Sequence, residues 1–316
     1  MESLPEDAIL EFNPDTLDVV RRMYNLDKPG EMSNAVDIFE AWVQQQNHFM
    51  KKDFSRGYLE RMIIAAKGSV ERAKGRLDRL CTLRNLVPHF FGDFDVKTDF
   101  KDVEAGEIIY APLPKLTKNN ERVIFVRVRS KKMTTEAILN GFRFCLLLVE
   151  YMKEYDYAAS YIFATDHREC NFTEMISKIN LVDARNFFTL LVEGYGVRLS
   201  GIHIVTPNKF LDAFMAIMRQ IMPEKISGRI RIHKSYDSVY EFADKEILPK
   251  EYGDGTEERS LDDIYAQWKE ILSSEKQREH HRETIKACTD ESKRQTDKFN
   301  EKYMGMPGTF RTLKVD

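Results

Sequence analysis

The sequence predicts an α/β protein in which a helical N-terminal lobe precedes a mainly parallel β-sheet covered by helices. Two observations support this fold class. Residues 1–92 show only helical periodicity, whereas from residue 107 short runs of β-branched and aromatic residues alternate with longer helical segments. Strands that alternate with helices are typical of a parallel sheet with helices on its faces. The chain has 316 residues, of which 42% are hydrophobic, and this suffices to bury a large core.

The N-terminal lobe is expected to consist of four helices. A turn at Asp27–Gly30 separates the first two, and Gly68 with the N-cap candidate Ser69 separates the last two. Pro88 ends the fourth helix, because proline cannot continue the hydrogen-bonded ladder. The expected helices span 14–25, 34–49, 58–66 and 70–86.

The following elements alternate in type. The expected strands span 108–111, 123–128, 160–165, 201–205 and 229–232, and the expected helices span 135–155, 172–179, 184–193 and 207–222. The helix at 207–222 has the widest apolar face, with residues at i, i+4, i+7, i+8 and i+11. These residues are Phe210, Phe214, Ile217, Met218 and Ile221. Such a face needs a large apolar partner, which is a core, a membrane or a bound lipid.

The sequence gives little support to an enzyme, a metalloprotein or a nucleic-acid-binding protein. It contains no phosphate-binding glycine loop, no nucleophile elbow and no zinc-protease motif, so we expect no catalytic residue, cofactor or metal. The four cysteines are scattered, as in a reduced cytoplasmic protein, and a net charge of -3 argues against nucleic acid. No signal peptide or 18-residue apolar run is visible. His203, in an apolar strand, is expected to be a core or pocket-wall residue.

Three motifs resemble the CRAL-TRIO lipid-binding family. They are VRLSGIHI at 197–204, PEKISGRI at 223–230 and LPKEYGDG at 248–255, and the stretch at 69–91 resembles the helical region that precedes the family's domain. The ending GMPGTFRTLKVD resembles insect members of the tocopherol-carrier-like group. The resemblance implies an N-terminal lobe at 1–92, a lipid-binding domain at 93–272 and a charged C-terminal arm and tail at 273–316.

The resemblance also implies a function. The expected protein is a cytoplasmic carrier that encloses a small hydrophobic lipid, of tocopherol, retinoid, carotenoid or isoprenoid type, in an apolar cavity. The helix at 207–222 is the implied gate, and contact with phosphoinositide-containing membranes is peripheral and transient. The alternatives are a phospholipid exchange protein, or a lipid sensor that recruits a protein partner through the charged stretch at 274–302.

Site residues follow from the same resemblance. The implied ligand-binding residues are Leu147, Tyr161, Phe163, Thr165, Phe187, Leu190, Leu191, Val197, Leu199, Ile202, Phe210, Phe214, Ile217, Met218 and Ile221. Thr165, Tyr161 and His203 are the groups expected to orient a ligand hydroxyl or carbonyl.

The resemblance further implies that Arg198, Lys225 and Arg229 bind a phosphoinositide headgroup. Two further basic positions of the family's patch are occupied here by Ser200 and Ile64, which puts tight headgroup selectivity in question. A second departure is the run Asp166–Glu169, where the family's D-x-E-G motif has lost its glycine.

Overall fold

The computed structural model describes residues 3–104, 108–130, 132–207, 211–222 and 224–294. Its sheet consists of β1 (Ile108–Leu116), β2 (Glu121–Val128), β3 (Ser160–Asp166), β4 (Leu199–Val205) and β5 (Ile230–His233). The strands lie in the order β1-β2-β3-β4-β5, with β1 and β2 antiparallel and all other neighbours parallel. The prediction of an α/β fold with a mainly parallel sheet is confirmed.

Strand β1 forms an edge of the sheet and contains Pro112 and Pro114. Proline has no backbone N–H to donate, so an edge strand tolerates it where a central strand does not. Only residues 117–120 connect β1 to β2, and so short a connection requires antiparallel pairing. The sequence predicted only 108–111 of this strand, because the prolines mask its second half.

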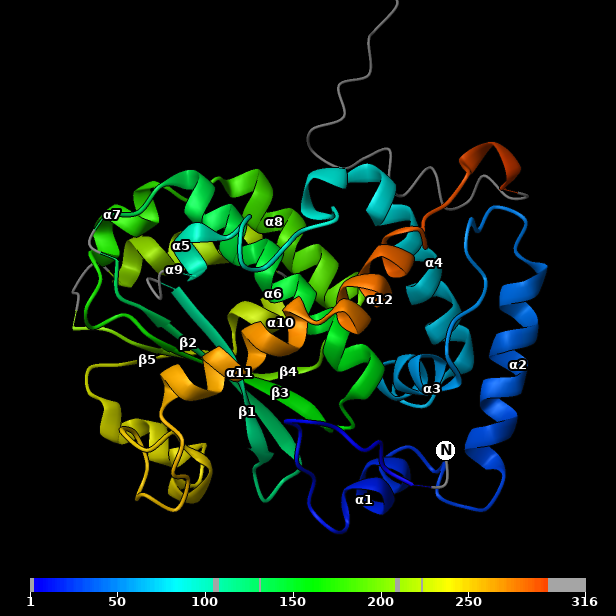
Figure 1. The fold of residues 1–316 in the computed structure, drawn as a ribbon, viewed down its shortest axis with the longest axis horizontal. Helices are drawn as coiled ribbons and strands as arrows, with labels where there is room; N and C mark the ends of the chain where they lie inside the picture. The colour runs from blue at the N-terminus through cyan, green and yellow to red at the C-terminus, as the bar shows by residue number, and fades with distance from the viewer. Residues whose placement is uncertain (1–2, 105–107, 131, 208–210, 223, 295–316) are drawn as a thin grey trace, which may run out of the picture.

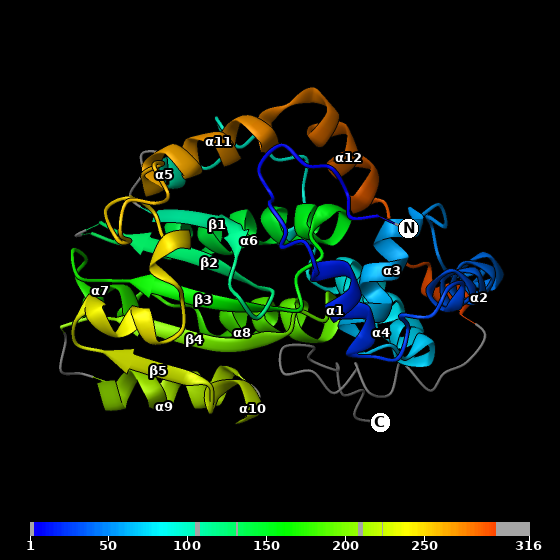
Figure 2. The ribbon, with the colours of Figure 1, turned by 90° about the horizontal axis from the view of Figure 1, so that it is seen from below.

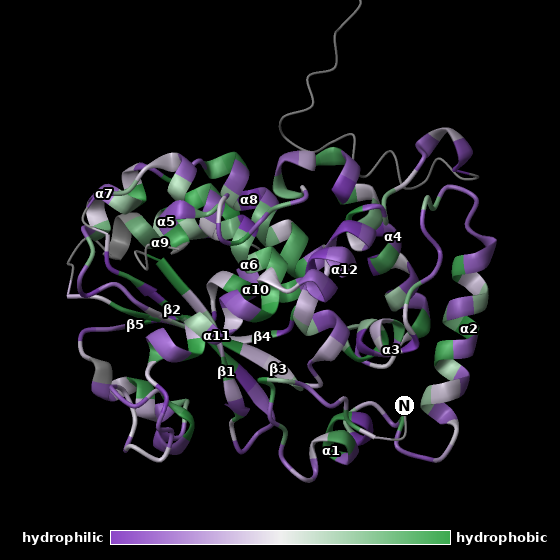
Figure 3. Ribbon diagram, viewed as in Figure 1, coloured by the Kyte–Doolittle hydropathy of each residue, from purple (hydrophilic) through white to green (hydrophobic). Residues whose placement is uncertain are grey.

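Helices cover one face of the sheet. The long helix α6 (Thr135–Tyr155), α8 (Leu181–Thr189) and α9 (Leu211–Ile221) lie on this face (Figure 1). Figure 3 shows apolar residues concentrated on α6 and α8, which therefore have a hydrophobic side to bury against the strands. The shorter elements of this layer are α5 (Lys101–Glu104), α7 (Phe172–Ser177), the π-helical turn η2 (Leu190–Gly194) and α10 (Glu224–Ser227).

The segment after β5 covers the other face of the sheet and then the β1 edge (Figure 2). Its elements are η3 (Tyr236–Glu241), η4 (Lys245–Ile247) and α11 (Leu261–Ser273). On the face, the ring of Tyr252 lies 4.7 Å from that of Phe125. At the edge, the Trp268 indole N–H donates to the Pro112 carbonyl at 2.8 Å. The edge strand is thus shielded from pairing with another chain.

The N-terminal lobe has a hydrophobic core of its own, centred on Phe39, Met62 and Leu77, which are fully buried. Its elements are α1 (Thr16–Arg22), α2 (Glu31–Gln45), α3 (Arg56–Ala65), α4 (Val70–Leu86) and the short turn η1 (Pro88–Phe90). Where α4 meets α6, Arg84 and Glu150 form a buried ion pair at 2.9 Å. The domain boundaries at 92 and 272 stay predictions.

The chain returns to the N-terminal lobe through α12 (Glu275–Ile285) and η5 (Glu291–Lys293). We call residues 286–294 the C-terminal strap. Thr289 forms an isolated antiparallel bridge with Phe49, and the Arg294 guanidinium pairs with the Asp78 carboxylate at 2.8 Å. This part of the expected arm is therefore packed against the lobe; its tail at 295–316 lies outside the described residues. None of the helices in the described ranges has the length and apolar run needed to cross a bilayer.

Candidate functional site

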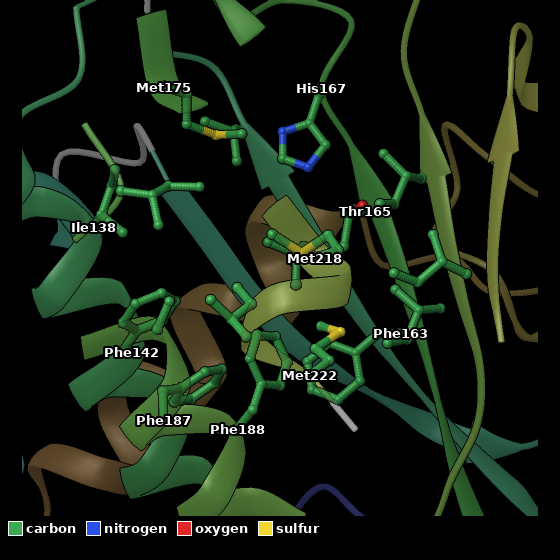
Figure 4. A pocket seen from close by; sticks show the side chains of 18 of the residues that line it. Ile138, Phe142, Phe163, Thr165, His167, Met175, Phe187, Phe188, Met218 and Met222 are labelled. Carbon is green, nitrogen blue, oxygen red and sulfur yellow. The ribbon is translucent and has the colours of Figure 1, made fainter. Parts of the chain in front are cut away.

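A cavity of about 190 Å³ lies between the sheet and the helices that cover it (Figure 4). Alternation along β3 directs Phe163 and Thr165 into the cavity, while Ile162 and Ala164 point to the opposite face. The pairing of β3 with β4 shifts register at Tyr161/Ile162. Because of this shift, Leu199 and Ile202 of β4 both face the cavity although they are three residues apart. With residues of β1, β2 and β5, these side chains form a mostly apolar floor.

Aromatic and methionine side chains from the helices form the remaining walls. Phe142 of α6 and Phe187 of α8 stack with ring centroids 4.4 Å apart. Phe214, Met218 and Ile221 of α9 also line the cavity, which places the predicted apolar face of that helix toward it. Methionine is flexible and adapts to ligands of different shape.

The structure places most of the predicted ligand-binding residues at the cavity and the others elsewhere. Those that line the cavity are Phe163, Thr165, Phe187, Leu191, Leu199, Ile202, Phe214, Met218 and Ile221. Leu190 and Val197 are buried in the core, Ile217 is half-buried, and Leu147 and Tyr161 line two other, smaller cavities. Phe210 lies outside the described residues. The assignment of these residues to a ligand stays a prediction.

Sequence reasoning missed many wall residues. They are Ile108, Tyr110, Val126, Val128, Met133, Ile138, Phe142, His167, Met175, Ile179, Ala184, Phe188, Ile204, Met222 and Ile230. His167 could have been found, because it continues the alternation of Phe163 and Thr165.

His203 lies on the opposite face of the sheet and does not line the cavity. Its ring stacks on Phe242 at a centroid distance of 3.5 Å, and its Nδ1 lies 3.0 Å from Nε2 of His233. Burial and the neighbouring His233 lower the pKa of His203 to about 4, so its imidazole is neutral at pH 7. Of the two positions expected from the sequence, a core and a pocket wall, His203 therefore does not occupy the wall of this cavity; it packs on the opposite face of the sheet.

The loop after β3 is held by hydrogen bonds to the Asp166 carboxylate at the end of that strand. The Arg168 guanidinium donates to the Asp166 carboxylate at 2.7 Å, and the Tyr252 hydroxyl donates to the same carboxylate at 3.2 Å. Burial opposes ionisation of Asp166, but these bonds lower its pKa on balance. Arg168, which replaces the acid of the family motif, therefore has a structural partner.

Two of the three basic residues predicted to form a patch lie close together. Arg198 donates to the Ala159 carbonyl at 3.1 Å, and its pKa is lowered by burial and by the nearby charge of Arg229. Arg229 donates to the Leu199 carbonyl. Lys225 is exposed on α10, so it is accessible to an external anion.

The two departures from the family's basic patch lie beside Arg198. Ile64 is buried and lines the same small cavity as Arg198. Ser200 is exposed, and its hydroxyl donates to the Tyr161 carbonyl at 3.1 Å. Neither side chain supplies a positive charge.

Lys153 lines this small cavity together with Arg61 and Arg198. The lysine is 7% exposed, and no hydrogen bond or ion pair joins its ammonium group to any residue in the described ranges. Burial, with the charges of Arg76 and Arg61, lowers the pKa of Lys153 to about 7. The small cavity therefore contains a buried amine whose charged form is disfavoured, although Asp156 lines the same cavity.

Fold and cavity together define the class: an α/β domain with an apolar cavity between a mainly parallel sheet and its covering helices. Residues 107–255 match the family model described as the CRAL/TRIO domain. The match contains all five strands and the helices from α6 to α10.

Curated relatives agree with this class. The chain is 23% identical over 230 residues to "Alpha-tocopherol transfer protein-like" from Homo sapiens and from Pongo abelii, and 22% identical to that of Mus musculus. The aligned region covers 72% of this chain and spans 66% of the length of these relatives. Among solved structures, "Crystal structure of Sfh5" is similar with a TM-score of 0.47 and 11% identity, covering 83% of this chain and 99% of that chain.

Proposed function

We propose that this protein is a carrier that binds one small hydrophobic lipid in the cavity and transfers it to membranes. The observation that carries the proposal is the apolar cavity, whose volume of about 190 Å³ exceeds that of the roughly 150 Å³ apolar cavities that bind benzene. Each methylene moved from water into such a site contributes about 0.8 kcal/mol. CRAL-TRIO proteins bind lipophilic ligands and transfer them, and the names of the relatives favour a tocopherol-like ligand.

We further propose that the segment 207–222 is the gate. Its helix α9 contributes Phe214, Met218 and Ile221 to the cavity wall, while Arg219 and Gln220 are exposed. A wall helix with a wide apolar face loses little when it opens at a bilayer, because its apolar residues then contact lipid instead of water.

Filling the cavity is expected to abolish lipid binding. Ala184 of α8 lines the cavity, so Ala184→Phe places a ring inside it. After incubation with a total lipid extract, native mass spectrometry should detect one lipid per wild-type molecule and at least about tenfold less on the variant. Val182→Phe, at an exposed position of the same helix, is the control and should bind as the wild type does. Equal lipid on both variants would place the ligand elsewhere.

Removal of the exposed patch charge is expected to weaken membrane binding. We propose that Arg198, Lys225 and Arg229 contact a phosphoinositide headgroup, and one lysine near an anionic surface contributes about 1 kcal/mol. Lys225→Ala should therefore reduce sedimentation with phosphatidylinositol-bisphosphate vesicles about fivefold. Lys250→Ala, exposed on the other side of the sheet, is the matched control. If Lys225→Ala lowers the sedimented fraction no more than Lys250→Ala does, the proposed phosphoinositide contact of Lys225 is contradicted.

Two finer points belong to the same proposal, and the experiments above distinguish it from its alternatives. The division at 1–92, 93–272 and 273–316, and membership of the insect tocopherol-carrier-like group, are proposed from the sequence resemblance. A phospholipid exchange protein would retain a phospholipid in the mass-spectrometry experiment. A lipid sensor would bind lipid stoichiometrically without moving it between vesicles, and an enzyme would convert it.

A further inference from the structure

The cavity has one end that carries hydrogen-bonding groups. Tyr110 of β1, Val126 of β2 and Thr165 of β3 are register partners, so the two hydroxyl-bearing side chains occupy one row across the sheet. His167 follows Thr165 by two residues and lines the same cavity. These three polar side chains therefore lie toward the carboxyl ends of β2 and β3.

The opposite end of the cavity is apolar. In Figure 4, His167 and Met175 lie at one end, and Phe163, Phe187 and Met222 lie at the other. In the part of the chain that the structure describes, no lysine, arginine, aspartate or glutamate lines the cavity. The walls therefore suit an uncharged molecule with one polar end.

The His167 imidazole has an unused hydrogen-bonding position. Its Nδ1 lies 3.7 Å from the Cys170 sulfur, and its ring packs edge-on against Phe172 with centroids 5.3 Å apart. Its Nε2 forms no hydrogen bond with any residue of the described ranges. Burial lowers the pKa of His167 to about 4, so the ring is neutral at pH 7 and has one donor and one acceptor nitrogen.

Two hydroxyl groups lie on the same side of the cavity. The Thr165 hydroxyl donates to the His203 carbonyl at 3.3 Å and keeps its own lone pairs. The Tyr110 hydroxyl is accommodated by Gly141 of α6, since a Cβ atom there would lie 2.8 Å from the hydroxyl oxygen. Buried polar groups are nearly always hydrogen-bonded, so a ligand that reaches this end gains by supplying the missing partner.

We infer that the ligand is an uncharged amphiphile with a hydroxyl or carbonyl group, which hydrogen-bonds to Nε2 of His167 while its hydrocarbon part lies toward Phe163 and Phe187. The inference rests on the proposed carrier function and narrows its ligand class. Charged carboxylates and phosphomonoesters are disfavoured, because a neutral imidazole in an apolar cavity cannot offset the desolvation of a full charge.

Three matched probes test the inference: dodecan-1-ol, dodecane and dodecanoate, each titrated into the full-length protein and quantified by native mass spectrometry. The wild type should bind dodecan-1-ol about tenfold more tightly than dodecane, and dodecanoate more weakly than dodecan-1-ol. His167→Phe keeps an aromatic ring and should remove the preference for the alcohol without weakening the binding of dodecane. His167→Gln restores a hydrogen-bonding group and should retain part of the preference.

The outcomes separate this inference from the carrier proposal. If the wild type binds alcohol and alkane equally, or if His167→Phe keeps the preference, the role of His167 is overturned and the carrier proposal stands. Tighter binding of dodecanoate overturns the uncharged ligand class. If none of the probes binds, the carrier proposal fails together with the inference. Met175→Leu, which changes an apolar residue at the same end, is the control and should leave the preference intact.

Discussion

Asp156→Ala is expected to lower the free energy of unfolding by about 3–5 kcal/mol, because it removes one partner of a fully buried ion pair. The Asp156 carboxylate and the Arg122 guanidinium are 2.8 Å apart, and both side chains are 0% exposed. The remaining guanidinium hydrogens of Arg122 donate to the carbonyls of Leu113 and Pro114. These bonds hold the arginine in place after the substitution, so its charge stays buried without a counter-charge. Equilibrium denaturation in urea measures the loss.

The matched control is the surface pair of Lys118 and Asp244, which are 3.0 Å apart. The lysine side chain is 75% exposed, so Asp244→Ala should cost less than about 1 kcal/mol. Both substitutions remove an aspartate carboxylate that lies at a similar distance from its cation, and the two pairs differ strongly in burial. A cost for Asp156→Ala no larger than that of the control would contradict the burial of the first pair.

Lys153→Met is expected to stabilise the protein at pH 7 by about 4 kcal/mol and to change its pH dependence. The pKa of Lys153 is about 7 in the folded protein, against 10.5 for an ordinary lysine. Between these values the unfolded chain binds the additional proton, so folding must remove it. The wild-type free energy of unfolding should therefore rise, through this group, from pH 7 to pH 10.

Comparison of the two proteins isolates this contribution, because all other groups titrate in both. The advantage of Lys153→Met over the wild type should shrink to below about 1 kcal/mol at pH 10. Lys178→Met, at an exposed position, should give no pH-dependent difference. Parallel stability curves for Lys153→Met and the wild type would show that the lysine is solvated in the folded protein.

Local patterns predicted the elements whose signals are complete within a short stretch of chain. The expected helices at 70–86 and 135–155 coincide with α4 and α6, because each begins at a side-chain cap, Ser69 and Thr134. The second half of β1 was not predicted, since its prolines are tolerated only at a sheet edge, and edge position depends on the whole topology. The packing of the strap on the N-terminal lobe was likewise not predicted, because its partners there lie about 200 residues away in the sequence.

The sequence predicted residues of the cavity wall only where the pattern lies within one helix or one strand. Helical spacing on α9 identified Phe214, Met218 and Ile221 as one face, and this face lines the cavity. Tyr110 was missed because its place beside Thr165 arises from register across three strands. Tyr161 lies on the same face of β3 as Phe163 but beyond the end of this cavity. It lines the smaller cavity that contains Lys153 and Arg198. Which part of a strand borders a cavity depends on the helices above it.

A ribosome delivers the C-terminal strap long after its partners, which belong to the N-terminal lobe. Asp78 of the N-terminal lobe is buried with His48 at 2.8 Å and acquires Arg294 only when synthesis has passed that residue. Asn85 likewise acquires its partner Thr289 late. Lobes made early generally fold early during translation. In this protein the first lobe stays unfinished until the nascent chain has passed residue 294, so premature termination leaves a buried carboxylate without its arginine.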